Sequence, residues 1–242
     1  MQSSLYVALS SQIALEKRLT TTANNVANMA TAGFRAEEVS FSELLARSNR
    51  GEVAFVGPGS STLSRAAGPI TKTDSPLDVA VQGDAWLGVQ GPKGTTLHTR
   101  DGRLTMDANG QLRTVGGLPV VDPGGGPLLL DPQAGPPTIG RDGSIHQGVN
   151  QVGALGLFSL DPKAKLTRAG ENAVASSLPG RPVQDFTRIG LVQGHVEGAN
   201  VNPILEMTKL IAIQRAFESA AAMNAEADNT LTGAIKTLGP QG

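Results

Sequence analysis

The feature that most constrains the fold of this chain is the uneven placement of glycine and proline. Of 30 Gly and 15 Pro in 242 residues, 26 Gly lie between Gly51 and Gly198, and 13 Pro lie between Pro58 and Pro182. Glycine destabilises a helix interior through its backbone entropy, and proline does so because it lacks an amide donor. The sequence therefore predicts helices at both ends and a turn-rich middle.

An amphipathic helix is expected near the N-terminus. Residues recur there at alternating steps of three and four, and Gly33 follows where a helix could stop. This heptad pattern comprises Leu5, Ala8, Gln12, Leu15, Leu19, Thr22, Val26 and Met29.

A second helix is expected at the C-terminus, where Asn202 can cap it and Pro203 suits its first turn. Its pattern comprises Met207, Leu210, Gln214, Phe217, Ala221, Asn224, Asp228, Leu231, Ile235 and Leu238. Polar residues in both patterns indicate helices that are not self-sufficient. The helices either pack on the middle of the chain as ordinary amphipathic helices or pair with each other and with neighbouring molecules.

Short β-prone runs bounded by turn residues predict an antiparallel β domain in the middle. The expected strands are Leu77–Val81, Ala85–Gln90, Thr95–Thr99, Arg103–Met106, Gln111–Val115, Leu118–Val121, Leu128–Leu130, Ser144–Gln147 and Leu155–Leu160. Asp101-Gly102, Asn109-Gly110 and Asp142-Gly143 are typical hairpin turns, and the first and third look like one reused hairpin.

Less regular stretches flank this β domain. Residues 35–73 are expected to be a bent connector with a short helix at Ser42–Arg47, and 161–194 to be irregular before a strand at Leu191–Val196. The predicted fold is α+β. Terminal helices at 1–34 and 199–242 form a discontinuous coiled-coil assembly domain, 35–75 is the connector, and 76–198 is a Gly/Pro-rich antiparallel β domain.

Composition excludes several classes of function. A net charge of -1 offers no field to hold a nucleic acid, and the absence of Cys removes disulfides and thiolate chemistry. The start of the chain lacks the order of charges and apolar residues of a secretory signal, and no run of about 18 apolar residues predicts a membrane span.

No catalytic, cofactor or metal site is predicted. The three histidines, His98, His146 and His195, show neither ligand spacing nor a recognisable triad order. Residues 91–96 lack the spacing of a phosphate-binding loop, and 107–110 lack the later ligands of a calcium loop. We therefore expect a protein that is not an enzyme.

Three stretches carry a resemblance to a known family. Residues 23–35 (ANNVANMATAGFR) are similar to the N-terminal signature of bacterial flagellar rod and hook proteins, and 197–203 (EGANVNP) with 206–218 to their C-terminal signature. Residues 76–90, 99–102 and 109–112 resemble the β domain of the same family. The resemblance covers most of the chain and is weakest at 39–73 and 162–190.

Within this family, Ala85-Trp86-Leu87 is closer to the proximal rod type than to the distal type, which usually carries phenylalanines here. Val26 departs from the common Leu. The resemblance implies a structural part of the torque-transmitting shaft that polymerises through its terminal helices. The alternatives are a distal rod protein, a cell-surface β domain that binds glycans through exposed aromatic residues, and third, a hydrolase with paired acids.

The resemblance also implies partners, a location and an assembly surface. The partners would be other rod proteins, copies of itself and the flagellar type III export apparatus, with no nucleic acid and no membrane insertion. The location would be the rod across the periplasm, reached without a cleaved signal peptide. Asn24, Asn25 and Asn28 are open to two interpretations, local bonding at a helix end or amide bonds between subunits.

The expected assembly residues are Leu5, Leu15, Leu19, Asn24, Asn25, Val26, Asn28, Met207, Leu210, Gln214, Phe217, Asn224 and Leu231. The family-motif residues are Thr31, Gly33, Phe34, Asn200, Val201, Asn202, Glu206, Arg215 and Glu218.

Overall fold

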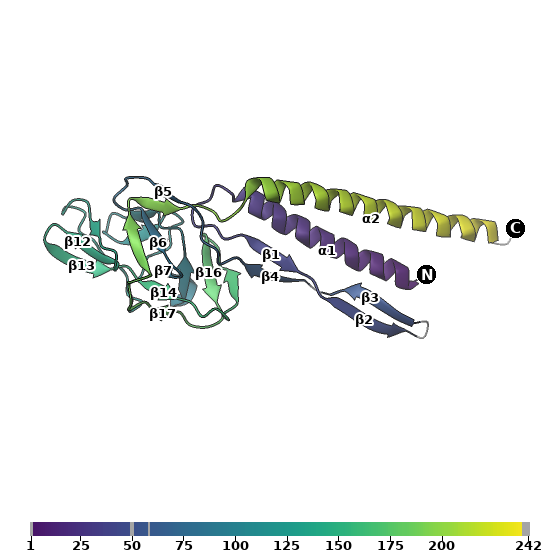
Figure 1. Ribbon diagram of the computed structural model, residues 1–242, viewed down its shortest axis with the longest axis horizontal. Helices are drawn as coiled ribbons and strands as arrows, with labels where there is room; N and C mark the ends of the chain where they lie inside the picture. The colour runs from purple at the N-terminus through teal and green to yellow at the C-terminus, as the bar shows by residue number, and fades with distance from the viewer. Residues whose placement is uncertain (1, 49–50, 58, 239–242) are drawn as a thin grey trace. The chain divides into compact units, whose positions relative to one another are not determined.

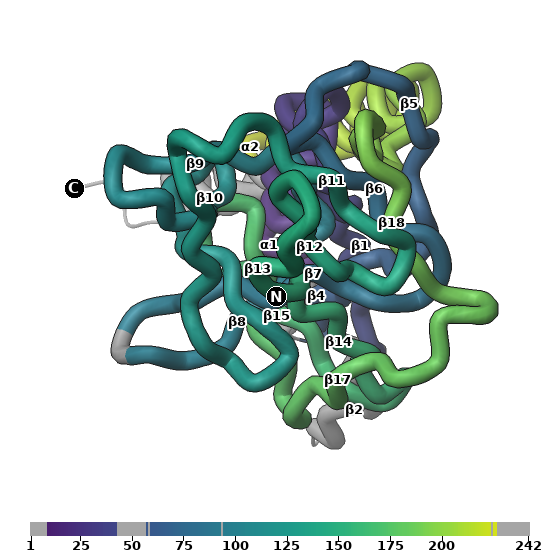
Figure 2. The backbone as a smooth tube through the Cα atoms, turned by 90° about the vertical axis from the view of Figure 1, so that its left-hand side faces the viewer, coloured from purple at the N-terminus to yellow at the C-terminus, as the bar shows by residue number. Residues whose placement is uncertain are grey.

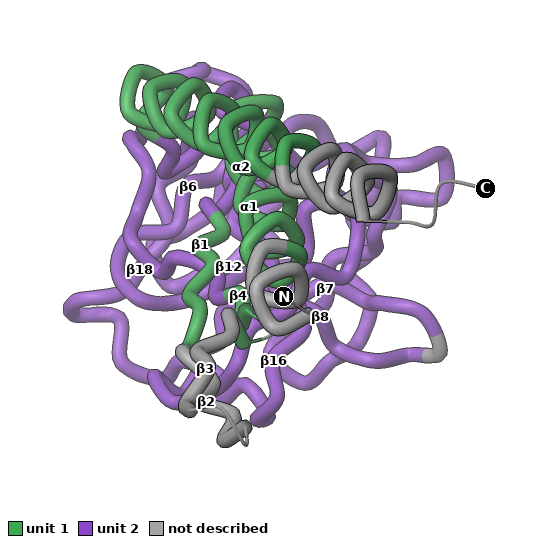
Figure 3. The backbone as a smooth tube through the Cα atoms, turned by 90° about the vertical axis from the view of Figure 1, so that its right-hand side faces the viewer, with its two compact units in different colours: residues 1–27, 37–61, 202–242 green, residues 28–36, 62–201 purple. Residues whose placement is uncertain are grey.

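The computed structural model describes residues 2–48, 51–57 and 59–238, and contacts within the chain divide it into two compact units. Unit 1 is drawn from 1–27, 37–61 and 202–242, and unit 2 from 28–36 and 62–201 (Figure 3). Unit 1 contains the two long helices and unit 2 is built from antiparallel strands. The predicted α+β class is confirmed.

Unit 1 contains two helices that run side by side in opposite directions (Figure 1). They are α1 (Gln2–Ala27) and α2 (Pro203–Leu238). The predicted cap of α2 is confirmed, because the Leu205 amide donates to Asn202 Oδ1 over 3.2 Å and Pro203 is the first helical residue. No helix within the described residues is long and apolar enough to span a membrane.

The inner faces of α1 and α2 are partly polar. Thr22 and Asn25 are buried on α1, and Glu206 and Ile213 on α2. Gln214, which the heptad pattern places in the core, is exposed. Leu210 and Phe217 are half-buried in agreement with that pattern, but Ile213 takes the place of Gln214, since burying an apolar side chain is more favourable than burying its amide neighbour.

Four further strands lie in or next to unit 1. They are β1 (Glu37–Ser40) paired with β4 (Ser60–Leu63), and β2 (Glu43–Ser48) paired with β3 (Gly51–Val56). The short helix predicted at Ser42–Arg47 is wrong. Residues of β2 pair antiparallel with β3 from Glu43 opposite Val56 to Ser48 opposite Gly51, a ladder that outweighs a helix too short to offset its own nucleation cost.

The largest sheet of unit 2 is antiparallel and has six strands, of which Figure 2 labels β7, β8, β14, β15 and β17 along the backbone tube. Its order is β15 (Leu166–Arg168), β16 (Ala173–Ser176), β8 (Thr96–Thr99), β7 (Trp86–Gln90), β14 (Leu157–Ser159) and β17 (Arg181–Pro182). Three of these strands fall within 161–194, so the prediction that this segment is irregular is wrong. β15 and β16 form a local hairpin, whereas β16 also pairs with the distant β8 and β17 pairs with β14, so only the tertiary fold places these strands in one sheet.

Smaller antiparallel sheets complete unit 2. They are β5 (Ile70–Lys72) with β19 (His195–Glu197), β6 (Val79–Gln82) with β18 (Gly190–Gln193), β9 (Leu104–Met106) with β10 (Leu112–Thr114), and β11 (Thr138–Ile139) with β12 (Ser144–Gln147) and β13 (Asn150–Ala154). A short 3-10 helix, η1 (Pro92–Gly94), precedes β8. The predicted strand at Leu191–Val196 is divided at Gly194, whose φ is 72°.

Two of the three predicted hairpin turns are confirmed. Gly110 (φ 81°) joins β9 to β10, and Gly143 (φ 86°) joins β11 to β12. The Asp101-Gly102 hairpin is wrong, and with it the reused hairpin, because β8 pairs with β7 and β16 instead of β9. Gly102 is required for space, since a Cβ there would lie 1.7 Å from the Val79 carbonyl oxygen.

The core of unit 2 is aliphatic. Val79, Leu87, Val89, Leu112 and Val120 are fully buried between the sheets. The predicted strands at 118–121 and 128–130 contribute to this core but pair only through isolated bridges. A second cluster forms around Trp86 with Leu63, Leu160, Leu166 and Val174. Unit 2 therefore has one aliphatic cluster and one that includes the single tryptophan of the chain.

Candidate assembly site

The outward face of α2 is apolar at its start. Ile204 is 80% exposed and Ile211 is 53% exposed, and Met207 lies between them on the same face. Arg215 and Glu218 continue this face toward the C-terminus, and both are exposed. Contiguous exposed apolar side chains are typical of a surface that binds another protein.

The outward face of α1 has the same character. Leu9 is 50% exposed and Ile13, one turn later, is 58% exposed. Asn24 lies further along this face and is exposed. Each helix therefore has a partly polar face inside unit 1 and an apolar stripe outside. We call Leu9, Ile13, Ile204, Met207 and Ile211 the outer stripe.

The expected assembly residues fall into three groups in the structure. Leu15, Leu19, Val26, Asn28, Leu210 and Phe217 are half-buried, Asn24, Met207 and Gln214 are exposed, and Asn25 is buried. The side chains of Leu5, Asn224 and Leu231 lie outside the part of the chain that is described. The exposed group is available to a partner, and the half-buried group faces the rest of its own unit.

Asn25 holds three parts of unit 1 together. Its Nδ2 donates to the Glu37 carbonyl (2.9 Å) and to Glu206 Oε2 (3.1 Å), and its Oδ1 accepts from the Glu37 amide (3.0 Å). Glu206 Oε1 accepts from Lys209 Nζ (2.6 Å). Asn25 thus joins α1 to the start of β1 and to α2, and its amide is used within the chain.

The residues that follow α1 fold into unit 2. Gly33 has φ 67° and donates its amide to the Glu197 carbonyl over 2.7 Å. A Cβ on Gly33 would lie 2.2 Å from the Asp101 amide nitrogen, so only glycine fits. Thr31 makes a local turn, donating its amide and its hydroxyl to Asn28.

Asn200 joins the two ends of unit 2. The backbone amide of Asn200 donates to the Phe34 carbonyl (3.2 Å), and its side-chain Oδ1 accepts from the Ala36 backbone amide (2.6 Å). Its Nδ2 donates to Ser64 Oγ (3.1 Å) and to the Ala66 carbonyl (2.8 Å). This side chain therefore connects the segment after α1, the segment before β5 and the segment before α2.

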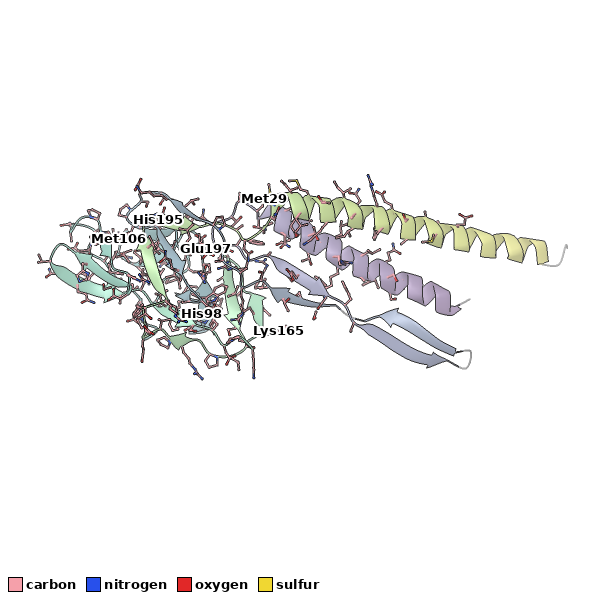
Figure 4. The ribbon with its side chains drawn as sticks, in the orientation of Figure 1. Met29, His98, Met106, Lys165, His195 and Glu197 are labelled. Carbon is pink, nitrogen blue, oxygen red and sulfur yellow. The ribbon has the colours of Figure 1, made fainter. Side chains whose placement is uncertain are left out.

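A buried ionic cluster lies beside these bonds. Glu197 Oε1 forms an ion pair with Arg35 Nη2 (2.7 Å) and accepts a hydrogen bond from the Gly68 amide (2.8 Å), and Oε2 accepts one from Arg100 Nη1 (2.9 Å). The three charged side chains are at most 2% exposed. Both guanidinium carbons lie 5.4 Å from the Trp86 ring centroid. Figure 4 shows Glu197 within unit 2, among its strands. We call Arg35, Trp86, Arg100 and Glu197 the junction cluster.

The hairpin of β15 and β16 covers the segment after α1. The guanidinium carbon of Arg168 lies 4.1 Å from the Phe34 ring centroid, and its Nη2 donates to the Arg35 carbonyl over 2.6 Å. Asn172, in a left-handed conformation with φ 56°, donates to the Ala32 carbonyl. The N-terminal motif is therefore held within unit 2 by side chains far away in sequence.

Burial controls the titration of this region. It lowers the pKa of Arg100 to about 10, and the nearby Glu197 carboxylate opposes the shift. Burial also lowers the pKa of Arg35, again opposed by Glu197. Both guanidiniums remain charged near neutral pH. His98, buried against Phe158, has its pKa lowered by burial to about 4, so its imidazole is neutral at pH 7.

The described residues form no metal site, calcium loop or exposed aromatic surface for sugars. They contain no group of three His, Asp or Glu residues placed to hold a metal. Asp107 forms a turn, its Oδ1 accepting from the Asn109 and Gln111 amides over 2.9 Å. Trp86 is 1% exposed, so its ring is not available to stack on a sugar.

Three family models match this chain. Residues 5–35 match a model described as flagella basal body rod protein, 80–147 the flagellar hook protein FlgE/F/G D1 domain, and 192–236 the flagellar basal body rod FlgEFG protein C-terminal. The chain therefore belongs to the family of flagellar rod and hook proteins.

Individual relatives narrow this assignment. The flagellar basal-body rod protein FlgF of Mesorhizobium japonicum is 47% identical over 239 residues, which cover 99% of each chain. FlgF of Rhizobium meliloti is 44% identical with the same coverage. FlgG of Buchnera aphidicola is 30% identical over 262 residues, covering 97% of this chain and 98% of its own. The protein is a structural component of the flagellar basal-body rod, of the proximal, FlgF type.

Sequence reasoning missed the junction cluster and the residues that cover it. Arg35, Arg100 and Glu197 all lie within the stretches that resemble the family, which was the available signal, but nothing local marks their charges as buried. The partners Arg168 and Asn172 lie more than 130 residues from the segment they hold, beyond the reach of any local pattern.

Proposed function

We propose that the protein polymerises with other axial proteins and with copies of itself through α1 and α2, and so builds the shaft that transmits torque. The observation that carries this proposal is the outer stripe, since each helix presents apolar side chains outward after its inner face is already used. The family membership supplies the context of an axial assembly. When subunits join head to tail and the rotation from one to the next does not close into a ring, they form an open helical tube. A shaft requires such a tube.

The coiled-coil character of the helices is part of this proposal. In a single chain, α1 and α2 bury Thr22, Asn25 and Glu206 together with Ile213. Polar inner positions lower the stability of a helix pair while fixing its register. Neighbouring subunits that cover the outer stripe would supply the missing apolar surface. Helices of this kind order fully only when their partners are present.

The division of the chain into an assembly domain (1–34 with 199–242), a connector (35–75) and a β domain (76–198) remains our proposal for the subunit. Intrachain contacts group 28–36 with the strands of unit 2. We therefore propose that the motif at 31–36 acts from the β side, as the base from which α1 extends.

The remaining features of the proposal follow from the family. We propose a structural, non-enzymatic protein that uses no cofactor. We further propose that it passes through the flagellar type III export apparatus without a cleaved signal peptide and resides in the periplasmic part of the rod. The low charge and the absence of Cys are compatible with this route.

The decisive experiment places a charge in the outer stripe. Ile211→Asp puts a carboxylate at a half-exposed apolar position without changing the inner face, so the purified chain should remain folded by circular dichroism. We expect loss of co-purification with other rod proteins and loss of swimming in a strain that carries only this variant. Ala216→Asp, at an exposed position outside the stripe, is the matched control and should swim. Normal swimming of Ile211→Asp would refute assembly through this face.

A further inference from the structure

The junction cluster contains residues from the segment that follows α1 and from the strand that precedes α2. Arg35 belongs to the segment that follows α1, and Glu197 ends β19, a few residues before α2. Gly68, whose amide also binds Glu197, belongs to the segment that leads into β5. The Glu197 carboxylate, close before α2, therefore contacts both the segment that follows α1 and the segment that leads into β5.

Glu197 is the member on which the others depend. Arg35 also donates to the Ala66 carbonyl, and Arg100 donates to the Val81 (2.9 Å) and Gly83 (2.6 Å) carbonyls. These carbonyls are neutral, so the carboxylate is the group that compensates two buried positive charges at hydrogen-bond distance. Without it, the two guanidiniums that flank the Trp86 ring would repel each other across a site with little water.

The two guanidiniums differ in how firmly the chain holds them. Arg100 follows β8, in the middle of the six-stranded sheet. Arg35 lies in a segment without regular structure, which is held by side-chain and isolated backbone bonds. If the Glu197 charge is removed, the segment with Arg35 should detach from the strands before the region of Arg100 does, because its local opening requires less free energy.

We propose that Glu197 is a positioning residue for assembly: by pairing with Arg35 and Arg100 it locks the segment 28–36, which follows α1 in the chain, onto the strands of unit 2. This inference deepens the proposed function and rests on it for its biological meaning. The lock closes only when β19 has docked, because Glu197 is its last residue. The order of the segment that follows the first helix thus depends on a residue more than 160 positions later.

The chain carries its own reporters for this lock. Trypsin cleaves after arginine, and Arg35 and Arg100 are both 2% exposed, so neither bond is accessible while the cluster is closed. Trp86 is the single tryptophan of the chain and packs against both guanidiniums. Its accessibility to a quencher therefore reports on the packing at the cluster.

The test compares full-length wild type with Glu197→Gln, which keeps the shape of the side chain but removes its charge. We expect cleavage after Arg35 to be at least tenfold faster, cleavage after Arg100 to change less than twofold, and acrylamide quenching of Trp86 to increase. The far-ultraviolet circular dichroism should be unchanged. Asp107→Asn, which breaks the half-exposed Asp107–Arg113 pair, is the matched control and should alter none of these readouts.

A second variant keeps the test decisive if Glu197→Gln does not fold. Arg35→Lys retains the charge and the trypsin site but lacks the forked donor that reaches both Glu197 and the Ala66 carbonyl. In this variant too, trypsin should cleave faster after residue 35 while cleavage after Arg100 stays nearly unchanged. If either folded variant opens both sites in parallel, or neither, Glu197 serves only the general stability of unit 2 and the inference is overturned.

Motility separates this inference from the proposed function. A strain with a folded, released variant should fail to swim, as should one with Ile211→Asp, whose lock stays closed. If the released variant swims normally while Ile211→Asp does not, the positioning role is refuted and assembly through the outer stripe stands. If Ile211→Asp swims, the proposed assembly face is refuted, and the protease result still decides whether the lock exists.

Discussion

Single residues in this protein differ sharply from neighbours of the same type. Asn24 and Asn25 are adjacent asparagines of one motif, yet Asn24 is exposed and Asn25 is 3% exposed with bonds to Glu37 and Glu206. The helix turns about 100° per residue, so the two amides lie on different faces. Their consequences for stability should differ accordingly.

Replacing Asn25 by alanine should destabilise unit 1 by about 2 to 3 kcal/mol, because the buried Glu206 carboxylate and both backbone groups of Glu37 lose their partner. Asn24→Ala should change stability by less than about 0.5 kcal/mol, as is usual for exposed positions. Urea unfolding followed by helix circular dichroism measures both variants. Equal effects would show that the bonds of Asn25 contribute nothing specific.

Gly33 and Gly117 provide a second matched pair. Both have positive φ (67° and 86°), but a Cβ at Gly33 would meet the Asp101 backbone at 2.2 Å while a Cβ at Gly117 meets nothing within 4 Å. Gly33→Ala should cost more than about 3 kcal/mol through strain and overlap, and Gly117→Ala only about 1 kcal/mol through backbone strain. Thermal unfolding followed by Trp86 fluorescence would contradict this account if both alanines cost the same.

His98 should make unit 2 sensitive to acid. Its pKa is lowered by burial to about 4, whereas the unfolded value is 6.5, so the unfolded chain binds a proton in a range where the folded chain does not. Stability should fall as the pH drops below 6.5 and level off below about 4, with a loss of about 2 kcal/mol at pH 5. In His98→Leu this part of the pH dependence should vanish, and in His146→Gln it should persist. Denaturant unfolding at pH 5 and pH 7 distinguishes the two.

At the scale of elements, the position of each long helix in the chain is set by the residues at its ends, and its packing by its two faces. Asn202 caps α2 and β19 leads into it, so the start of α2 is well defined. The hairpin of β2 and β3 shows the opposite case, where pairing over many residues overrode a weak local preference for helix. The helix expected at Ser42–Arg47 was wrong because its local signal was weaker than this ladder, and the Asp101-Gly102 hairpin was wrong because β8 pairs with β7 and β16 instead.

Asn202→Ala should destabilise α2 by about 1 kcal/mol, since the Leu205 amide would lose its acceptor. Asn202→Asp should retain the cap and add a favourable charge at the helix N-terminus. Amide hydrogen exchange in the first turn of α2 measures the effect. Unchanged exchange in the alanine variant would show that the cap is not needed there.

At the scale of the whole molecule, the chain is a strand-built unit whose first and last segments both continue into helices. Unit 2 has its own core around Val79, Leu87 and Leu112, and it contains 28–36 as well as 62–201. Because the buried apolar contacts are concentrated there, its stability should exceed that of the helices in an isolated chain.

Brief proteolysis of the purified protein should therefore remove both termini and leave a protected core that begins near residue 28 and ends near 201. The start near 28 is specific to the junction cluster, since a core of strands alone would begin after residue 61. Mass spectrometry of the fragments identifies both ends. Helices that are protected as well as the strands would contradict the dependence of α1 and α2 on neighbours.

The sequence by itself determined which parts of this protein are helical and which are turn-rich, because glycine, proline and the spacing of apolar residues act locally. The cap at Asn202 and the turns at Gly110 and Gly143 were readable for the same reason. The tertiary structure alone decided which charges are buried. Arg35, Arg100 and Glu197 come from three distant segments, and a charge reveals its burial only when folding removes the surrounding water and brings its counter-ion within hydrogen-bond distance.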